Sequence, residues 1–540
     1  MKTKLLIFFT ILCGIVNGQC VMVKDIFPGA DSSMASSIIN VGSTAYFLAN
    51  DGINGKELWK SDGTVSGTVM VKDINPGSGS SGTTALMSIN DTLYFRADDG
   101  TNGSELWKSD GTAIGTVMVK DINPSATGSF PSSLFNMNGV LYFNANDGTN
   151  GKELWKSDGT ATGTVMVKDI NGGLNDGDPS SFINAGGTLY FKAQDGNGFE
   201  LWKSDGTSSG TLMVKDIRPG SSGSNPFSFI YFNTNLFFGA NDGTNGYELW
   251  KSDGTSTGTV IVKDINPGSL ASNATPSIVF NSTLILTADD GSTGTEIWES
   301  DGTTTGTVLL KDINSGSGAS TPGGPFTIVN TDLLFNANDG TTGSEFWKTD
   351  GTTSGTVMIK DINLGAGSSI GYPPSFININ DTLYFAATDG LNGKELWRSD
   401  GTSSGTTMVQ DIKTGANSSN PTFLTNVNGV LFFSANDGTN GRELWKLGNI
   451  TTSISPVITN GSLTIFPNPF SSATTLQTDN YFKNATLTIY NLYGQTVKQI
   501  KNISGQTITL YRDNLPNGLY FIRLTQDSKV ITADKLVITD

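Results

Sequence analysis

The 540-residue chain contains no histidine and only two cysteines, Cys13 and Cys20. Without histidine, the usual Ser-His-Asp triads and His-ligated zinc sites are excluded. Cys13 lies in an N-terminal stretch that we expect to be removed, which leaves Cys20 alone in the mature chain. An intrachain disulfide is therefore excluded, and stability must come from packing.

Basic residues are scarce, with 33 Lys and Arg against 49 Asp and Glu, which gives a formal net charge of −16. Like charges repel at contact range, so this balance disfavours phosphate backbones and anionic lipids as partners. We do not expect the protein to bind nucleic acid.

Long apolar runs are rare, and the clearest one extends from Leu5 to Val16 behind Lys2 and Lys4. It is too short to span a bilayer but is typical of a secretory signal. The sequence therefore predicts a signal peptide over residues 1–18 and no transmembrane segment in the mature chain. Glycine is abundant instead, at 66 residues, and many tight turns between short apolar runs indicate an all-β protein.

A motif of the form E-[LIF]-W recurs along most of the chain and contains every tryptophan, at spacings of 47 to 50 residues. Each repeat holds four short apolar runs separated by turn signals, so we expect four strands per repeat. This period and strand count are typical of β-propeller blades. The tryptophans are Trp59, Trp107, Trp155, Trp202, Trp250, Trp298, Trp347, Trp397 and Trp445.

The two ends of the repeat region are complementary. The run "VMVKDI" opens at Val21, whereas the ninth repeat stops after "ELWKLG" and lacks that run. We therefore expect strand 21–26 to pair beside strand 443–446 and close one ring of about nine blades. Nine exceeds the usual four to eight or so, which leaves an open ring, two displaced repeats or a linear solenoid as alternatives.

The acidic residues follow the repeat, since four recurring positions hold 35 of the 49 Asp and Glu. Their first explanation is structural, because the Asp of a D-G turn can cap backbone amides. Lys60 and Lys72 have counterparts in most repeats and can pair with these carboxylates across the hairpin.

Calcium is the alternative explanation, because "DGTNGSE" offers several oxygen ligands around one turn. The spacing does not match an EF-hand, and Thr293 and Thr342 replace the asparagine in two repeats, which weighs against a required ligand. The candidate metal ligands are Asp51, Glu57, Asp99, Asn102, Glu105, Asp147, Asn150 and Glu153.

Without histidine, the remaining catalytic arrangement is a pair of carboxyl groups, as in glycosidases. Such a pair needs one protonated and one ionised carboxyl group in different environments, and nine equivalent repeats give no sign of that difference. We predict no catalytic or cofactor-binding residues. Departures from the repeat are where a unique site can lie, and they include Asp176, Asp178, Glu299 and Gln410.

At "ELWKSDGT" the repeat resembles the bacterial ELWxxDGT repeat family, over about residues 21–446. The resemblance implies repeat architecture and no particular activity. We assign residues 19–447 to this repeat domain and residues 448–462, which are polar and uncharged, to a linker.

Residues 463–540 alternate apolar and polar positions and predict a small Ig-like β-sandwich. The segments "PNP", "YNLYGQ", "LPNGLYFIRL" and "KLVIT" resemble the type A C-terminal sorting domain of type IX secretion substrates. The resemblance implies a Bacteroidetes-like source, handling by the type IX machinery, and a product released outside the cell or attached to the outer-membrane surface. The residues that carry it include Pro467, Asn468, Pro469, Gly494, Gly518, Tyr520 and Lys535.

The predicted function is a secreted or cell-surface, non-catalytic binding or adhesion module with a polysaccharide or surface-protein ligand. Many near-identical faces around a ring can engage a repetitive ligand with avidity. A secreted carbohydrate-active enzyme and a purely structural scaffold remain as alternatives.

Overall fold

Two compact units make up the chain, Met1–Asn449 and Ile450–Asp540. The computed structural model describes residues 18–371, 375–448, 463–491, 496–526 and 529–540, and these residues form strands and no helix. The predicted all-β class is confirmed. The predicted signal peptide lies outside the described residues except for Gly18, as does the predicted linker except for Gly448.

Within its described residues, the N-terminal unit contains nine four-stranded antiparallel sheets, numbered here in chain order. Sheets 1 to 5 are built as follows: sheet 1 from β2 (Ser36–Val41), β3 (Thr44–Asn50), β4 (Lys56–Ser61) and β5 (Val69–Lys72); sheet 2 from β6 (Thr84–Ile89), β7 (Thr92–Asp98), β8 (Ser104–Ser109) and β9 (Val117–Lys120); sheet 3 from β10 (Ser132–Met137), β11 (Val140–Asn146), β12 (Lys152–Ser157) and β13 (Val165–Lys168); sheet 4 from β14 (Ser180–Ala185), β15 (Thr188–Gln194), β16 (Phe199–Ser204) and β17 (Leu212–Lys215); and sheet 5 from β18 (Phe227–Phe232), β19 (Asn235–Asn241), β20 (Tyr247–Ser252) and β21 (Val260–Lys263).

The later sheets follow the same order, apart from the last. Sheet 6 consists of β22 (Thr275–Phe280), β23 (Thr283–Asp289), β24 (Thr295–Ser300) and β25 (Val308–Lys311); sheet 7 of β26 (Gly323–Val329), β27 (Asp332–Asn338), β28 (Ser344–Thr349) and β29 (Val357–Lys360); sheet 8 of β30 (Phe376–Ile379), β31 (Thr382–Thr388), β32 (Lys394–Ser399) and β33 (Thr407–Gln410); and sheet 9 of β34 (Thr422–Val427), β35 (Val430–Asn436), β36 (Arg442–Leu447) and the N-terminal β1 (Cys20–Lys24).

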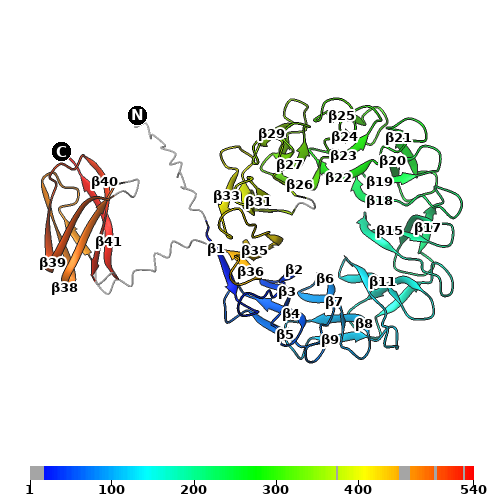
Figure 1. Ribbon diagram of the computed structural model, residues 1–540, viewed down its shortest axis with the longest axis horizontal. Helices are drawn as coiled ribbons and strands as arrows, with labels where there is room; N and C mark the ends of the chain where they lie inside the picture. Colours follow the sequence, from blue (N-terminus) through cyan, green and yellow to red (C-terminus); the bar gives the residue numbers. More distant parts are fainter. Residues whose placement is uncertain (1–17, 372–374, 449–462, 492–495, 527–528) are drawn as a thin grey trace, which may run out of the picture. The chain divides into compact units, whose positions relative to one another are not determined.

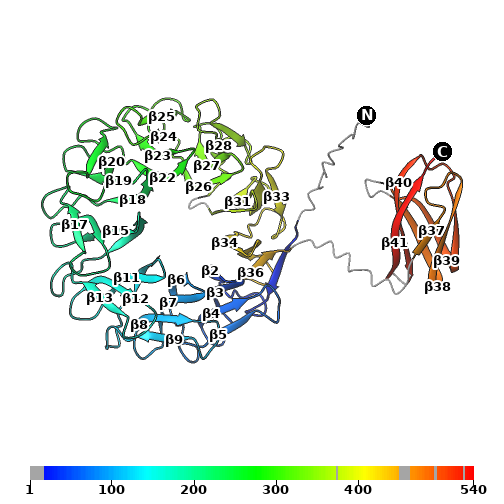
Figure 2. The ribbon, with the colours of Figure 1, turned by 180° about the vertical axis from the view of Figure 1, so that it is seen from behind.

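The sheets of this unit are arranged around a common centre, with their first strands inside and their fourth strands outside (Figure 1). Strands β2, β6, β22 and β26 lie toward the middle, and β5, β9, β21 and β25 lie at the outer edge. The reverse view shows the same order (Figure 2). The unit is therefore propeller-like.

Leu58 and Trp59 show why each sheet is apolar on both faces. Neighbouring residues of a strand point to opposite faces, so Leu58 packs against sheet 2 while Trp59 packs against Val23 and Ile26 beside β1. Burying each such side chain contributes about 1.5–3 kcal/mol. Among the described residues of this unit there are nine core clusters of this kind, one between each two neighbouring sheets and one between sheets 9 and 1.

Strand β1 comes from the N-terminal side of the chain but completes the last sheet. It runs antiparallel to β36, with Val21 opposite Lys446 and Met22 opposite Trp445. The predicted pairing of the two chain regions is confirmed, with the strand at Cys20–Lys24 rather than 21–26.

The C-terminal unit consists of β37 (Leu463–Phe466), β38 (Ala473–Tyr490), β39 (Thr496–Tyr511), β40 (Gly518–Gln526) and β41 (Lys529–Ile538). Register shifts within β38 bend this long strand, so its first part pairs with β37 and its last part with β40. The strands surround one core that includes Leu476, Leu487 and Ile522. The unit is a β-sandwich close to a barrel, and its Ig-like topology stays a prediction.

Candidate functional site

The aspartates of the D-G turns bind their own turns. Asp51 Oδ1 accepts the backbone N–H of Ile53 at 2.9 Å and of Asn54 at 2.8 Å, while Asn54 Nδ2 donates to Oδ2 at 2.8 Å. Burial raises the pKa of Asp51, but the hydrogen bonds from Asn54 and Ile53 outweigh burial, so the pKa lies below its ordinary value. Capping by this carboxylate is confirmed.

The same geometry recurs at the other two predicted turns. Asp99 accepts N–H groups from Thr101 and Asn102, and Asp147 accepts them from Thr149 and Asn150. The structure therefore brings each of these aspartates into contact with its predicted asparagine partner.

The glutamates of the E-[LIF]-W motifs lie elsewhere and are completely buried. Glu57 Oε2 accepts the N–H of Ile74 at 3.2 Å, and Oε1 accepts the N–H of Ser81 at 2.8 Å. Both donors belong to the segment that leads from sheet 1 to sheet 2. Glu105 and Glu153 hold the next two segments in the same way.

These glutamates do not join the turn aspartates. Among the described residues, no group of three or more Asp, Glu, Cys or His side chains is placed to hold a metal ion. Burial raises the pKa of Glu57 and Glu153 to about 7, against the hydrogen bonds that favour their ionised forms. Calcium binding by these residues stays a prediction.

All nine glutamates make this contact, including the one in sheet 9. Glu443 accepts the N–H of Ile26 at 3.1 Å and of Ser33 at 2.9 Å, although these partners are more than 400 residues away in sequence. The glutamate contact between sheets 9 and 1 is therefore the same as the one between sheets that follow each other in the sequence. The other members are Glu200, Glu248, Glu296, Glu345 and Glu395.

The predicted ion pairs of Lys60 and Lys72 are wrong. Lys60 Nζ donates to the carbonyl of Gly111 and Lys72 Nζ to that of Thr116, both at 2.8 Å in the next sheet. Within the described part of the chain, neither lysine forms an ion pair. The lysines are long enough to cross to the neighbouring sheet, where a carbonyl accepts their charge-assisted hydrogen bond.

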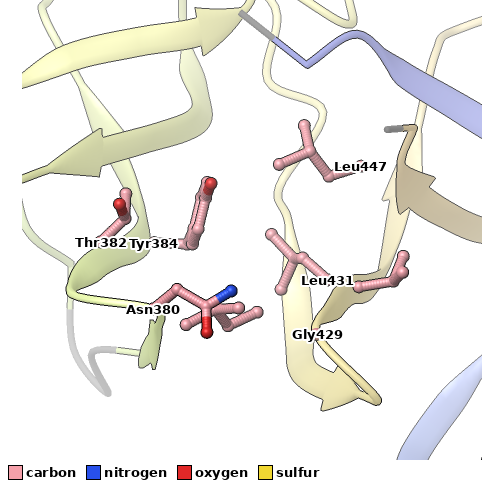
Figure 3. A pocket seen from close by; sticks show the side chains of 8 residues that line it. Asn380, Thr382, Tyr384, Gly429, Leu431 and Leu447 are labelled. Carbon is pink, nitrogen blue, oxygen red and sulfur yellow. The ribbon is translucent and has the colours of Figure 1, made fainter. Parts of the chain in front are cut away.

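A hollow of about 220 Å³ lies between sheets 8 and 9, where the two ends of the repeat region meet (Figure 3). Asn380, Thr382 and Tyr384 form a polar wall, and Leu431 and Leu447 form an apolar wall. The corresponding hollow between sheets 4 and 5 measures about 200 Å³ and is lined by Tyr190 and Asp253, among others.

Tyr384 differs from its counterparts because the ninth repeat lacks the S-D-G turn. A Cβ at Gly111 would lie 2.1 Å from the Tyr46 hydroxyl, so this glycine lies directly against the hydroxyl end of the side chain, and Tyr46 is buried. Sheet 9 has Leu447 and Gly448 where the other repeats have Ser or Thr followed by Asp, and Tyr384 is only half-buried. No carboxylate lines this hollow among the described residues, so it offers no acid pair for glycoside hydrolysis.

The departures from the repeat have local partners. Lys152 lies within 3.6 Å of Asp176 and 3.5 Å of Asp178. Gln410 Oε1 accepts the N–H of Cys20 at 2.9 Å, which ties β33 to β1. Burial raises the pKa of the partly exposed Glu299. Asp176, Asp178 and Gln410 therefore have structural partners, and Glu299 lies at a partly exposed position.

In the C-terminal unit, two of the predicted motifs are in contact. Asn468 Nδ2 donates to the carbonyl of Lys535 at 3.0 Å, and Asn468 Oδ1 accepts the N–H of Val537 at 2.8 Å. The "PNP" segment is thereby bound to the "KLVIT" strand. The carbonyl of Pro467 accepts the Thr474 hydroxyl at 2.6 Å.

Two of the remaining predicted residues of this unit, Gly518 and Tyr520, lie in β40. Gly518 begins β40 opposite Ile538, and the buried Tyr520 donates its hydroxyl to the carbonyl of Pro516 at 2.8 Å. Pro469 lies directly between Asn468 and the buried Phe470, and Gly494 lies outside the described residues.

No curated protein matches the chain. Among solved structures, PorZ, a surface component of the type IX secretion system of Porphyromonas gingivalis, is 13% identical, with a TM-score of 0.34 over 94% of this chain and 75% of the other. A puromycin hydrolase is 12% identical, with a TM-score of 0.35 over 69% and 60% of the two chains. A prolyl endopeptidase is also 12% identical, with a TM-score of 0.36 over 67% and 55%.

The described residues include no helix that is long and apolar enough to cross a membrane. Residues 464–539 match the family model of the secretion system C-terminal sorting domain. The chain therefore ends in a C-terminal sorting domain of the type IX secretion system.

Proposed function

We propose that the N-terminal unit is a closed nine-bladed β-propeller of the ELWxxDGT type that acts outside a Bacteroidetes-like cell as a non-catalytic binding or adhesion module. The sorting domain at residues 464–539 implies secretion, followed by surface attachment or release. This domain is the observation that carries the extracellular part of the proposal.

Closure is supported by three contacts that join the two ends of the repeat region. β1 pairs with β36, Glu443 holds Ile26 and Ser33, and the Thr425 hydroxyl donates to the carbonyl of Ile38 at 2.9 Å. A linear solenoid would leave its first and last repeats without such a contact.

A binding role is supported by the way the acidic residues are used. The motif glutamates and the turn aspartates accept backbone N–H groups, which accounts for their repetition without catalysis. Equivalent hollows at more than one junction suit a repetitive ligand such as a polysaccharide or an arrayed surface protein.

Binding and hydrolysis should be measured on the same ligands. The purified protein is applied to a polysaccharide array and to immobilised surface proteins, and the same glycans are assayed for released reducing ends. We expect binding without turnover. Turnover that a single carboxylate substitution abolishes would establish an enzyme instead, and neither binding nor turnover would leave a structural scaffold.

A further inference from the structure

Two departures from the repeat meet between sheets 4 and 5. The first is Tyr231, the last residue but one of the inner strand β18, where it pairs with Leu236. Five of the nine repeats have asparagine at this position, and Tyr231 is the only aromatic residue there. It is 40% exposed. In the order of the sheets, the nine residues are Asn40, Ser88, Asn136, Asn184, Tyr231, Val279, Ile328, Asn378 and Asn426.

The second departure is Gly186, which begins the turn after the inner strand of sheet 4. Seven of the nine repeats have asparagine at this place. In sheet 6 the asparagine, Asn281, donates from Nδ2 to the carbonyl of Asp350 in the next sheet at 3.2 Å, and sheet 7 has the same contact. Gly186 has no side chain that could reach the equivalent Asp253 of sheet 5, which leaves space beside that aspartate.

The two departures depend on each other. A Cβ at Gly186 would lie 2.8 Å from the Tyr231 hydroxyl, which is closer than a real Cβ approaches another atom. Tyr231 can therefore lie against the turn of sheet 4 because that turn has glycine. Both residues line the hollow of about 200 Å³ between the two sheets. Its walls come from residues 185–190, 231–236 and 252–253, all of which the structure describes.

Hydroxyl groups surround this hollow. Burial raises the pKa of the Tyr190 hydroxyl, and the nearby Asp253 carboxylate and Tyr231 hydroxyl raise it further, so the three groups lie close together. Within the described part of the chain, neither tyrosine hydroxyl forms a hydrogen bond, so both can bond to a ligand. Thr188 and Thr234 add two more hydroxyl groups to the lining.

Thr234 lines the hollow in an unfavourable backbone conformation. Its φ of 62° is in the left-handed region, which β-branched residues rarely adopt. Sheets 3, 4 and 9 have Gly139, Gly187 and Gly429 at this place in the turn, where glycine avoids the strain. The turn alone does not account for the threonine, and strained residues of this kind are typical of ligand sites.

One carboxylate and one ammonium determine the charge at the hollow. Asp253 Oδ1 accepts the hydroxyl of Thr255 at 2.7 Å and its N–H at 2.8 Å, and these bonds lower the pKa of Asp253. Lys203 Nζ donates to the carbonyl of the adjacent Gly254 at 2.9 Å, and its charge lowers that pKa further. The ionised carboxylate disfavours an anionic ligand, and the ammonium beside it disfavours a cationic one. A neutral ligand that donates a hydrogen bond to Asp253 suits this pair.

A sugar ring matches the size and the polar groups of the hollow. Pockets for drug-sized molecules measure about 300–1,000 Å³, so this smaller hollow suits a single ring. A sugar carries hydroxyls on successive carbons and can therefore bond to several of the lining groups at once, whereas a serine or threonine of a peptide carries one hydroxyl. The exposed ring of Tyr231 offers apolar surface for the C–H groups of the sugar.

We infer that the hollow between sheets 4 and 5 binds one neutral sugar residue of a glycan through Tyr190, Tyr231 and Asp253. This inference rests on the proposed binding function and gives it one specific site. It also gives a role to Gly186 and Tyr231, which the repeat architecture alone does not require.

Tyr231→Asn is the direct test, because it introduces the residue that five other repeats have at this position. The new side chain can accept the N–H of Thr234, as Asn136 accepts that of Gly139 at 2.9 Å, so the fold should be kept. Tyr231→Phe removes only the hydroxyl. Ser88→Asn is the matched control, since it also introduces asparagine at the equivalent position, in sheet 2 and away from the hollow.

Binding of neutral gluco-, manno- and galacto-oligosaccharides to the purified full chain should be measured by calorimetry. Sialylated and sulfated oligosaccharides serve as anionic probes, and glucosamine oligosaccharides as cationic ones. We expect one neutral series to bind, Tyr231→Asn to weaken its binding by about tenfold or more, and Tyr231→Phe to lie between. Ser88→Asn should bind like the wild type. A ligand-induced rise in Tm should be lost in Tyr231→Asn, whose Tm without ligand shows that it is folded.

Binding that Tyr231→Asn leaves unchanged, or that Ser88→Asn weakens equally, would overturn the site but not the binding function. If Tyr231→Asn does not fold, unchanged binding by Tyr231→Phe would overturn the role of the hydroxyl. Preference for charged oligosaccharides or for serine- and threonine-rich peptides would overturn the ligand class. If no polysaccharide or surface protein binds at all, the binding function itself fails. A neutral polysaccharide and a glycoprotein, tested before and after deglycosylation, identify the source of the sugar.

Discussion

At the residue scale, the buried glutamates connect neighbouring sheets of the repeat region. A carboxylate inside an apolar layer is costly unless it is hydrogen-bonded, and here each one accepts two backbone N–H groups that would otherwise lie buried without an acceptor. The glutamate therefore joins one sheet to the segment that begins the next.

Glu443→Ala should lower the thermal stability of the N-terminal unit. Removing the carboxylate leaves the N–H groups of Ile26 and Ser33 without their acceptor, at a cost of about 1–3 kcal/mol for each group. Tm is measured by differential scanning calorimetry. Glu299→Lys, which restores the usual residue at a partly exposed position, is the control and should change stability by less than about 0.5 kcal/mol. Equal Tm values for the two variants would contradict this role of Glu443.

The same glutamates should make stability depend on pH. Burial raises the pKa of Glu57, Glu153 and Glu443 to about 7, above the ordinary value of 4.5. A folded-state pKa above the unfolded value means that this contribution is fully present below pH 4.5 and is lost as pH rises through about 7.

The turn aspartates have the opposite effect on the pH dependence of stability. The pKa of Asp51 is lowered, so its contribution is present above about pH 3.8 and is lost on further acidification. We expect Tm to be highest near pH 4, to fall between about pH 4.5 and pH 7, and to level off above about pH 7. Glu443→Gln should reduce the fall in Tm between about pH 4.5 and pH 7, and a Tm that rises over this range would contradict a raised pKa of the glutamates in the folded state.

At the element scale, β1 is the strand whose loss should matter most. Deleting residues 21–26 exposes the backbone of β36 and removes Ile26 from the core beside Trp59. We expect a large drop in Tm. The control deletion is Thr149, which shortens the "DGTNG" turn of sheet 3 to the "DGNG" found in sheet 4. A comparable Tm for both deletions would favour an open arrangement.

The "DGTNG" turns give a second test at this scale. Because Asp99 and Asp147 already accept hydrogen bonds from their own turns, we expect chelation by EDTA to leave Tm unchanged. A fall in Tm that saturating calcium reverses would instead establish calcium as a ligand of the folded state.

Elements and their order could be predicted from the sequence because the period of the tryptophans and the alternation around Leu58 and Trp59 are local signals. Contacts between sheets could not be predicted in this way, because they depend on residues that are far apart in the sequence. Lys60 was expected to pair within its hairpin but reaches Gly111, and the depth at which Glu57 lies depends on the neighbouring sheet.

At the scale of the whole molecule, the two units have separate cores. Among the described residues, the core of the C-terminal unit consists of residues from Leu463 to Ile538, and none of these residues belongs to the clusters between the nine sheets. Each unit can therefore be expected to keep its packing when the other is removed. The sorting role of the C-terminal unit can then be tested separately from the proposed binding function of the N-terminal unit.

Deleting residues 463–540 should consequently leave the N-terminal unit folded in the periplasm of a host with type IX secretion. The deletion removes the sorting domain at residues 464–539, while the core clusters of the nine sheets stay intact. Fractionation and surface labelling measure location, and calorimetry on the recovered protein measures Tm, which should stay near that of the corresponding transition in the full chain. As the converse test, fusing residues 463–540 to an unrelated periplasmic protein should carry that protein outside the cell. Equal surface amounts of full-length and truncated chains would refute the sorting role, whereas a truncated chain that unfolds would show that the N-terminal unit depends on the tail for stability.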